Sequence, residues 1–145
     1  MHPLPHNYQV NAAASGAGAV TLSAQGLPNI LSAPPAEFDG PGDQWSPETL
    51  LLAAVADCFV LSFRAVAGAS KFAWTSLDCQ THGVLDSVDH VTRFTQITNT
   101  ATLKIPASSP ESRAQSLLEK AEKICLISNS LACEVHLVVN ISHED

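Results

Sequence analysis

Basic residues are scarce in this chain, and none precedes Arg64. The 145 residues include 7 Lys and Arg against 14 Asp and Glu, which gives a formal net charge of −7. A protein that binds nucleic acid or an anionic membrane surface needs a cluster of positive charge. The composition therefore argues against both kinds of partner.

The sequence also lacks the short motifs of several enzyme and cofactor sites. It has no phosphate-binding loop, no nucleophile elbow and no dinucleotide fingerprint. The six histidines and four cysteines show no metal-ligand spacing, so we expect no metal and no bound cofactor. The first residues show no basic stretch followed by an apolar one, so we expect no signal peptide. A cytoplasmic protein with reduced thiols is the corresponding expectation.

Charged residues of either sign are few for the amount of apolar sequence. They make up 14% of the chain, whereas 46% is apolar, and a typical soluble domain is about a quarter charged. A chain of this length forms a single domain, here over residues 1–145. So much apolar sequence for one small domain suggests additional burial, most simply in an oligomer interface.

Hydrophobic periodicity predicts an α+β fold with an antiparallel sheet. The predicted elements are, in chain order, strands at 8–10, 19–23 and 29–32, a loop at 33–45, a helix from 47 to about 67, strands at 76–85 and 91–105 around a turn at 86–89, a helix that begins with a capping box at 108–111, and a strand at 133–142.

The first predicted helix is apolar on nearly every side, which is typical of a central core helix. Ser46 is its expected N-cap, and Pro47 takes the first helical position. Asp57 and Arg64 would be costly in lipid, so we do not read this segment as a membrane span. One face of the helix is expected to carry Leu51, Ala54, Val55, Cys58, Leu61, Ser62 and Ala65.

The second predicted helix is amphipathic, with an apolar stripe that ends at Cys125. A thiolate at a helix C-terminus is disfavoured by the helix dipole, so Cys125 is suited to a resolving role more than to an attacking one. Cys79 and Cys133 fall on the apolar faces of strands, where a free cysteine is usually a small buried hydrophobe. The stripe consists of Ala114, Leu117, Leu118, Ala121, Ile124 and Cys125.

Two segments resemble the OsmC/Ohr family, the osmotically inducible protein C and organic hydroperoxide resistance proteins. Ser46-Pro-Glu48, followed by Leu-Leu-Ala-Ala and by Ala-Asp-Cys58-Phe59, is similar to the family signature. Cys125-Leu-Ile-Ser-Asn129 is similar to the segment of the second family cysteine. The resemblance implies an intertwined α+β homodimer, in which antiparallel sheets are wrapped around long central helices and the active sites lie at the interface.

The resemblance also implies a thiol-dependent peroxidase that reduces hydroperoxides to alcohols in oxidative stress defence. The cysteine that matches Cys58 attacks the peroxide and becomes a sulfenic acid. The one that matches Cys125 condenses with it to a disulfide, and an external thiol or dithiol reductant restores both. Glu48 matches the glutamate that holds an arginine beside the reactive thiol. Ten residues of helix separate Glu48 from Cys58, about 15 Å, so a third residue or a second subunit has to connect them.

The family's arginine is missing from this sequence. Near Phe38, where the osmotically inducible branch has it, stands the acidic Glu37, and a carboxylate disfavours a nearby thiolate. One alternative function is therefore a thiol redox sensor or small-ligand binder without fast peroxidase activity. Another is a structural dimer with incidental cysteines. The residues left to replace the arginine, from either subunit, are Arg64, Lys71 and Arg93.

Overall fold

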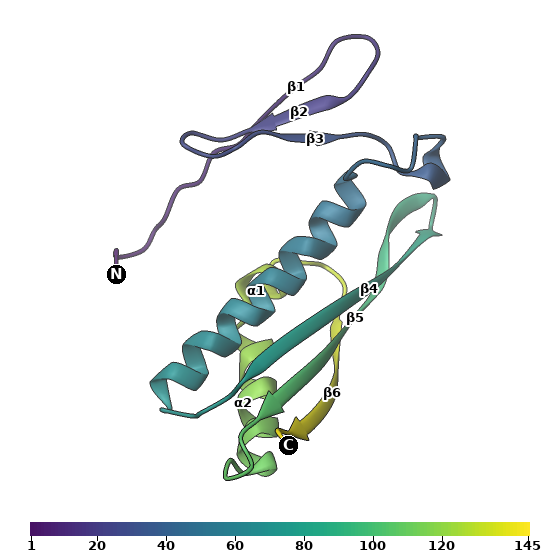
Figure 1. Cartoon of the computed structure of the whole chain (residues 1–145). Coiled ribbons are helices and arrows are strands. Elements are labelled where there is room, and N and C mark those ends of the chain that lie inside the picture. Colours follow the sequence, from purple (N-terminus) through teal and green to yellow (C-terminus); the bar gives the residue numbers. More distant parts are fainter. The chain divides into compact units, whose positions relative to one another are not determined.

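The computed structural model describes all 145 residues and divides them into two compact units, residues 1–50 and 51–145 (Figure 1). The first unit holds a three-stranded antiparallel sheet in the order β1-β2-β3. A short 3-10 helix follows in the proline-rich loop. The elements of this unit are β1 (Asn11–Ala13), β2 (Val20–Ser23), β3 (Ile30–Ser32) and η1 (Ala36–Phe38).

The first strand begins three residues later than predicted, so the strand at 8–10 was wrong. Asn11 pairs with Ser23 at the end of β2. In an antiparallel pair, residues before Asn11 would have to pair with residues after Ser23. There the chain already turns, with the Leu27 N–H donating to the Ala24 carbonyl at 3.1 Å. Residues 8–10 therefore have no strand beside them.

The second unit combines a three-stranded sheet with helices, and this order of elements confirms the α+β prediction. The sheet has the order β4-β5-β6. Helix α1 begins in the first unit and continues into the second. The elements are α1 (Pro47–Ala69), β4 (Ser76–Val88), β5 (Val91–Ile105), α2 (Glu111–Ile124), α3 (Leu126–Asn129) and β6 (Val135–His143).

Strands β4 and β5 form a hairpin that is longer than the sequence suggested (Figure 1). The pairing continues to Val88 opposite Val91, with a β-bulge between Val84 and Leu85. The turn predicted at 86–89 is therefore wrong. Asp89 and His90 both have positive φ, 52° and 64°, and two such residues make the tight turn whose twist suits a hairpin.

The third strand of this sheet pairs in parallel, which corrects the expectation of a purely antiparallel sheet. β6 lies beside β5 in register from Ile97–Val135 to Ile105–His143. Parallel neighbours need a crossover connection, usually a helix. Helix α2 is that connection, and it returns the chain to the end of the sheet where β5 started.

The core of the second unit lies between β5 and the two long helices. Burying a phenylalanine stabilises a fold by roughly 1.5–3 kcal/mol, and Phe59 and Phe63 of α1 are both fully buried. These aromatic rings take the inner side of α1, whereas Leu61 and Ala65, on the face named from the sequence, are exposed. The core comprises Phe59, Phe63, Val66, Ala67, Phe72, Ala101, Leu103, Ile105, Ala114, Leu117, Leu118 and Ala121.

Helix α1 has apolar surface that its own chain leaves uncovered. It is the one helix with the length and composition to cross a membrane, which is weak evidence because core helices share these properties. Only 28% of its most apolar stretch of 18 residues is buried. The outer side of the helix is therefore available for a further packing partner.

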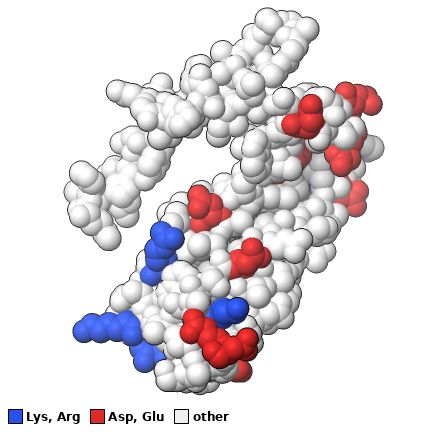
Figure 2. All heavy atoms as spheres, viewed as in Figure 1, with Lys and Arg blue, Asp and Glu red and all other residues white.

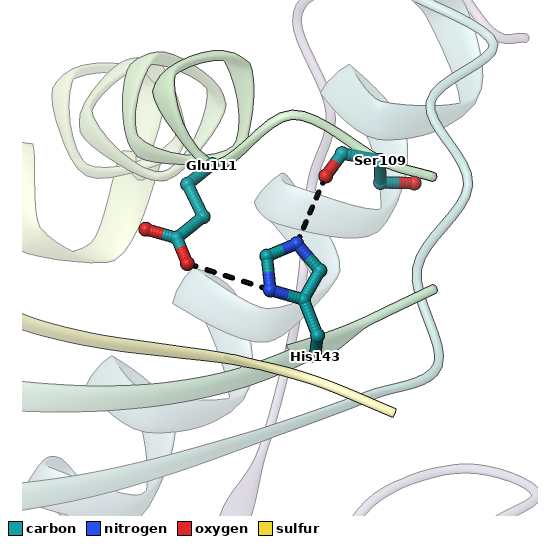
Figure 3. A network of polar contacts seen from close by, with 3 residues as sticks. All are labelled: Ser109, Glu111 and His143. Carbon is teal, nitrogen blue, oxygen red and sulfur yellow. Dashed lines mark hydrogen bonds and ion pairs between the residues drawn. The ribbon is translucent and has the colours of Figure 1, made fainter. Parts of the chain in front are cut away.

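The capping box predicted for α2, with Ser108 and Glu111 as its two side chains, does not form. The N-cap is Pro110, without a side-chain capping bond. The Ser109 hydroxyl donates to the Ala73 carbonyl at 3.1 Å. The carboxylate of Glu111 lies 3.4 Å from Nδ1 of His143, whose Nε2 donates to the Ser109 carbonyl at 3.1 Å (Figure 3). These contacts attach the end of β6 to the start of α2.

The predicted N-cap of α1 is confirmed. The buried Ser46 hydroxyl accepts a hydrogen bond from the Thr49 backbone N–H at 3.2 Å. In return, the Thr49 hydroxyl accepts from the Ser46 backbone N–H at 2.9 Å. These two bonds satisfy donors that a helix start otherwise leaves open.

We predict that Ser46→Ala lowers the free energy of unfolding by about 1 kcal/mol, because the helix loses its side-chain cap. Urea unfolding followed by circular dichroism, at one protein concentration, measures the change. Ser15→Ala is the matched control, since the Ser15 hydroxyl bonds only to the Ala17 carbonyl in an exposed loop. Equal stability of the Ser46 and Ser15 variants would contradict the capping role.

Candidate functional site

An open, mostly apolar hollow of about 390 Å³ lies beside α1 in the second unit. Apolar clefts with a few polar groups are the usual binding places for small molecules. The Asp57 carboxylate is the only charged side chain that lines it, and no Lys or Arg does so. The lining residues are Ala54, Asp57, Cys58, Leu61, Ser62, Leu126 and Ile127.

Cys58 presents its thiol to this hollow. The residue is half-buried, and its Sγ lies 3.9 Å from the Ser62 hydroxyl one turn further along α1. The neighbouring Phe59 is fully buried in the core. The packing of that ring therefore fixes the rotation of α1 that turns Cys58 toward the hollow.

Cys125 is the buried partner of Cys58. It follows the last residue of α2 and precedes α3, and it is 0% exposed. Burial raises the pKa of Cys125, hydrogen bonding from the Ser128 hydroxyl and backbone opposes the rise, and the adjacent Cys58 thiol adds to it. The structure thus makes neighbours of the two cysteines that the sequence singled out, as free thiols that are not at disulfide distance.

Glu48 lies in the first turn of α1, within the first unit. Its Oε2 is buried and has no hydrogen-bond partner. A buried carboxylate oxygen normally has a donor, and residues 1–50 contain no Lys or Arg to supply one. The space-filling view shows basic atoms only over the second unit (Figure 2).

None of the three cations considered as replacements for the arginine lines the hollow. Arg64, Lys71 and Arg93 are all exposed. Within one chain, the Cys58 thiol is therefore accompanied by the Asp57 carboxylate and the Ser62 hydroxyl, and by no cation. The sequence indicated that the activating arginine is missing, and the hollow likewise has no basic side chain in its lining.

A buried polar network behind Cys125 escaped sequence reasoning. Asn99 on β5 is 0% exposed. Its Oδ1 accepts from the Thr81 hydroxyl at 2.6 Å, and its Nδ2 donates to Oε2 of Glu122 at 3.3 Å. The one available signal was an amide at an inward strand position between Ile97 and Ala101. This network connects the β4–β5 hairpin to the last turn of α2, from which Cys125 emerges.

Cys79 lies next to this network. Its Sγ is 3.8 Å from the Thr81 hydroxyl. Burial raises the pKa of Cys79 to about 11, negative charge on Glu122 and on Cys125 adds to the rise, and the Thr81 bond opposes it. Cys79 is therefore held as a neutral thiol near neutral pH. This supports the prediction that Cys79 stays outside the redox chemistry.

No other cluster offers a competing site. No group of three or more His, Cys, Asp or Glu side chains is placed to hold a metal ion. Ser109, His143 and Glu111 include the residue types of a hydrolase triad, but His143 contacts the Ser109 carbonyl and not its hydroxyl (Figure 3). The hollow around Cys58 is therefore the candidate site.

Residues 40–140 match the family of OsmC-like proteins. The uncharacterized protein YmaD of Bacillus subtilis (strain 168) is 30% identical over 111 residues, 74% of either chain.

Solved structures agree in fold. An OsmC-like protein of unknown function from Vibrio cholerae has a TM-score of 0.86 at 17% identity, and the match covers 93% of this chain and 99% of that one. An organic hydroperoxide resistance protein from Legionella pneumophila has a TM-score of 0.75 at 23% identity, with 97% and 99% covered. At such identities the likeness shows the fold.

We predict that Glu122→Gln removes part of the pH dependence of stability. Burial raises the pKa of Glu122 above 4.5, although the Asn99 bond opposes the rise. The folded state then binds the proton more tightly than the unfolded chain, so the free energy of unfolding increases as pH falls from the raised pKa towards 4.5. The neutral amide keeps an acceptor for Asn99 and cannot titrate. Urea unfolding at a series of pH values measures the difference.

Glu119→Gln is the control for this experiment, because it removes a carboxylate from the exposed side of the same helix. It should keep the pH dependence of the wild type. At neutral pH, the Glu122 variant should be at least as stable as the wild type. An unchanged pH dependence in Glu122→Gln would show that this carboxyl is not the titrating group.

Proposed function

This chain belongs to the OsmC-like family, and we propose that it reduces organic hydroperoxides to alcohols with Cys58 as the reactive thiol and Cys125 as the resolving thiol. The observation that carries the proposal is the pairing of the two. Cys58 opens to an apolar hollow, and Cys125 lies buried beside it. One accessible and one protected thiol is the arrangement that such a cycle needs.

The proposed cycle balances without a bound cofactor. The Cys58 thiolate attacks the peroxide, an S–O bond forms, the O–O bond breaks, and the alkoxide leaves as the alcohol after taking a proton. The Cys125 sulfur then attacks the Cys58 sulfenic acid, and water leaves as the disulfide forms. An external thiol or dithiol reduces this disulfide and is itself oxidised to a disulfide. Closing the disulfide requires a local movement, because both thiols are free in the structure.

The lining of the hollow favours a substrate with an apolar body. Leu61, Leu126 and Ile127 contribute aliphatic side chains to the lining, and Asp57 is its only charged residue. An alkyl or aryl hydroperoxide buries apolar surface there, which hydrogen peroxide cannot do. This supports an organic hydroperoxide as the substrate class.

Glu48 is the proposed positioning residue of the site. Its buried oxygen lacks a donor, and we propose that a basic side chain of a second copy supplies one. Arg64, Lys71 and Arg93 are exposed and therefore available for this. The proposal retains the family role of Glu48 without an arginine in the N-terminal half.

We further propose that residues 1–145 form one OsmC/Ohr-like domain that acts in the cytoplasm as an intertwined homodimer. The apolar surface of α1 is largely uncovered. In the first unit, Ile30 and Leu31 of β3 are 42% and 51% exposed, and a small sheet needs a covered face to be stable. A second copy presents the same surfaces and satisfies both at once.

A thiol redox sensor or small-ligand binder is the second candidate function. The observation that favours it is the charge of the hollow, where Asp57 is present and no cation stabilises a thiolate. In that case Cys58 would be oxidised stoichiometrically and would not turn over rapidly. The kinetic experiment below separates the two.

We predict that Cys58→Ser abolishes turnover of cumene hydroperoxide with dithiothreitol as reductant, because the attacking sulfur is lost. With hydroperoxide and without reductant, Cys125→Ser should accumulate a sulfenic acid on Cys58, which dimedone labelling and mass spectrometry detect. Cys133→Ser is the matched control and should turn over like the wild type. Undiminished consumption by Cys58→Ser would refute the peroxidase assignment. Stoichiometric oxidation of the wild type without turnover would favour the sensor.

We predict a particle of twice 15.3 kDa in sedimentation at micromolar concentration, because the exposed apolar surfaces need cover. Leu61→Asp places a charge on the exposed side of α1 and should shift the particle towards the monomer. Val138→Asp is the control, because Val138 on β6 is 47% exposed and Leu61 is 49% exposed. It should leave the particle at the size of the wild type. A wild-type monomer would rule out the dimer.

A further inference from the structure

Ser128 is the polar side chain that touches the buried thiol. Its hydroxyl donates to Sγ of Cys125 at 3.4 Å, and the two residues are 9% and 0% exposed. The nearby Ser130 hydroxyl is used differently, since it donates to the Leu126 carbonyl at 2.7 Å. Of the two serines that follow Cys125, only Ser128 directs its hydroxyl at sulfur.

We propose that Ser128 is a further catalytic residue, whose hydroxyl stabilises negative charge on the Cys125 sulfur while the disulfide with Cys58 forms and breaks. The inference rests on the proposed function, because it concerns the resolving thiol of that cycle. Its own support is the contact between the two side chains and their burial, which are independent of the identity of the peroxide.

During disulfide formation, the Cys125 sulfur attacks the sulfur of the Cys58 sulfenic acid. The S–S bond forms, the S–O bond breaks, and hydroxide leaves as water with the proton of the Cys125 thiol. The attacking sulfur is most reactive as a thiolate. Burial raises the pKa of Cys125, and the Ser128 side chain and backbone are the groups that oppose this rise. The hydroxyl thus replaces the water that a buried sulfur lacks.

During reduction, the external thiolate attacks the Cys58 sulfur, because that side of the bond opens to the hollow and Cys125 is inaccessible. The S–S bond breaks and its electron pair goes to the Cys125 sulfur. A mixed disulfide remains on Cys58, and a second thiol group of the reductant releases it. A leaving thiolate departs faster when it is stabilised. The Ser128 hydroxyl therefore acts on the same sulfur in both halves of the cycle.

The test uses the full-length protein with its disulfide formed by diamide, a diazene oxidant, so it does not depend on hydroperoxide turnover. Peptide mapping first establishes the Cys58–Cys125 bridge. The rate of its reduction by dithiothreitol is then compared among variants. Ser128→Ala should be about tenfold slower than wild type, since it loses a hydrogen bond to a developing charge. Ser130→Ala removes a hydroxyl from the same segment and should match the wild type.

A second readout separates chemistry from shape. In a Cys58→Ser background, the ultraviolet thiolate absorbance of Cys125 is taken as the difference from a Cys58→Ser, Cys125→Ser double variant. This absorbance should appear at higher pH when Ser128 is replaced by Ala. Thr and Val have the same shape and differ in the hydroxyl, so Ser128→Thr should reduce faster than Ser128→Val. This pair decides the question if Ser128→Ala does not fold.

Two results would overturn the inference, and they differ from failure of the proposed function. Equal reduction rates for the Thr and Val variants would show that the hydroxyl has no role, although the cysteine pair remains. An unchanged pH dependence of the Cys125 thiolate absorbance in Ser128→Ala would show the same. If diamide formed no Cys58–Cys125 bridge, the cysteine pair itself would be refuted, and the role of Ser128 with it.

Discussion

The burial of Phe59 and Phe63 is the constraint on which the candidate site depends. These two rings turn one side of α1 into the core formed with β5 and α2. Cys58 precedes Phe59, so the same rotation places its thiol at the flank of α1 that faces α3. Helix α2 packs into the same core and ends at Cys125. Two cysteines far apart in the chain thus meet because two helices share one core, and no local motif accomplishes this.

Much of the fold could be predicted from the preferences of neighbouring side chains. Pairings between segments distant in sequence could not. The cap at Ser46, the extent of α1 and the β4–β5 hairpin follow from side-chain preferences within a few residues. The parallel pairing of β6 depends on where the α2 crossover returns the chain. The capping box at α2 failed because Pro110 is the N-cap and Glu111 contacts His143, which is distant in sequence. Resemblance to the family located both cysteines of the site. The Asn99 network and the contact of Ser128 with Cys125 could be recognised only in the three-dimensional structure.

Of the two parts of the proposed active site, the hollow contains the reactive thiol but no activating cation. The thiol pair is present and close, whereas the cation expected beside it is absent from the lining and Asp57 stands there instead. Glu48 carries a buried oxygen without a donor. A single chain therefore has both an unsatisfied acceptor and an apolar helix face without cover. Both deficits have one physical remedy in a second copy, which connects the proposed dimer to the proposed chemistry.

The central claim is that Cys58 and Cys125 form one redox pair while Cys79 and Cys133 remain thiols. Peptide mapping by mass spectrometry, after one equivalent of organic hydroperoxide and rapid alkylation of free thiols, tests it most directly. The account predicts a Cys58–Cys125 disulfide with alkylated Cys79 and Cys133. A disulfide that includes Cys79 or Cys133, or four alkylated cysteines after complete loss of the hydroperoxide, would contradict it.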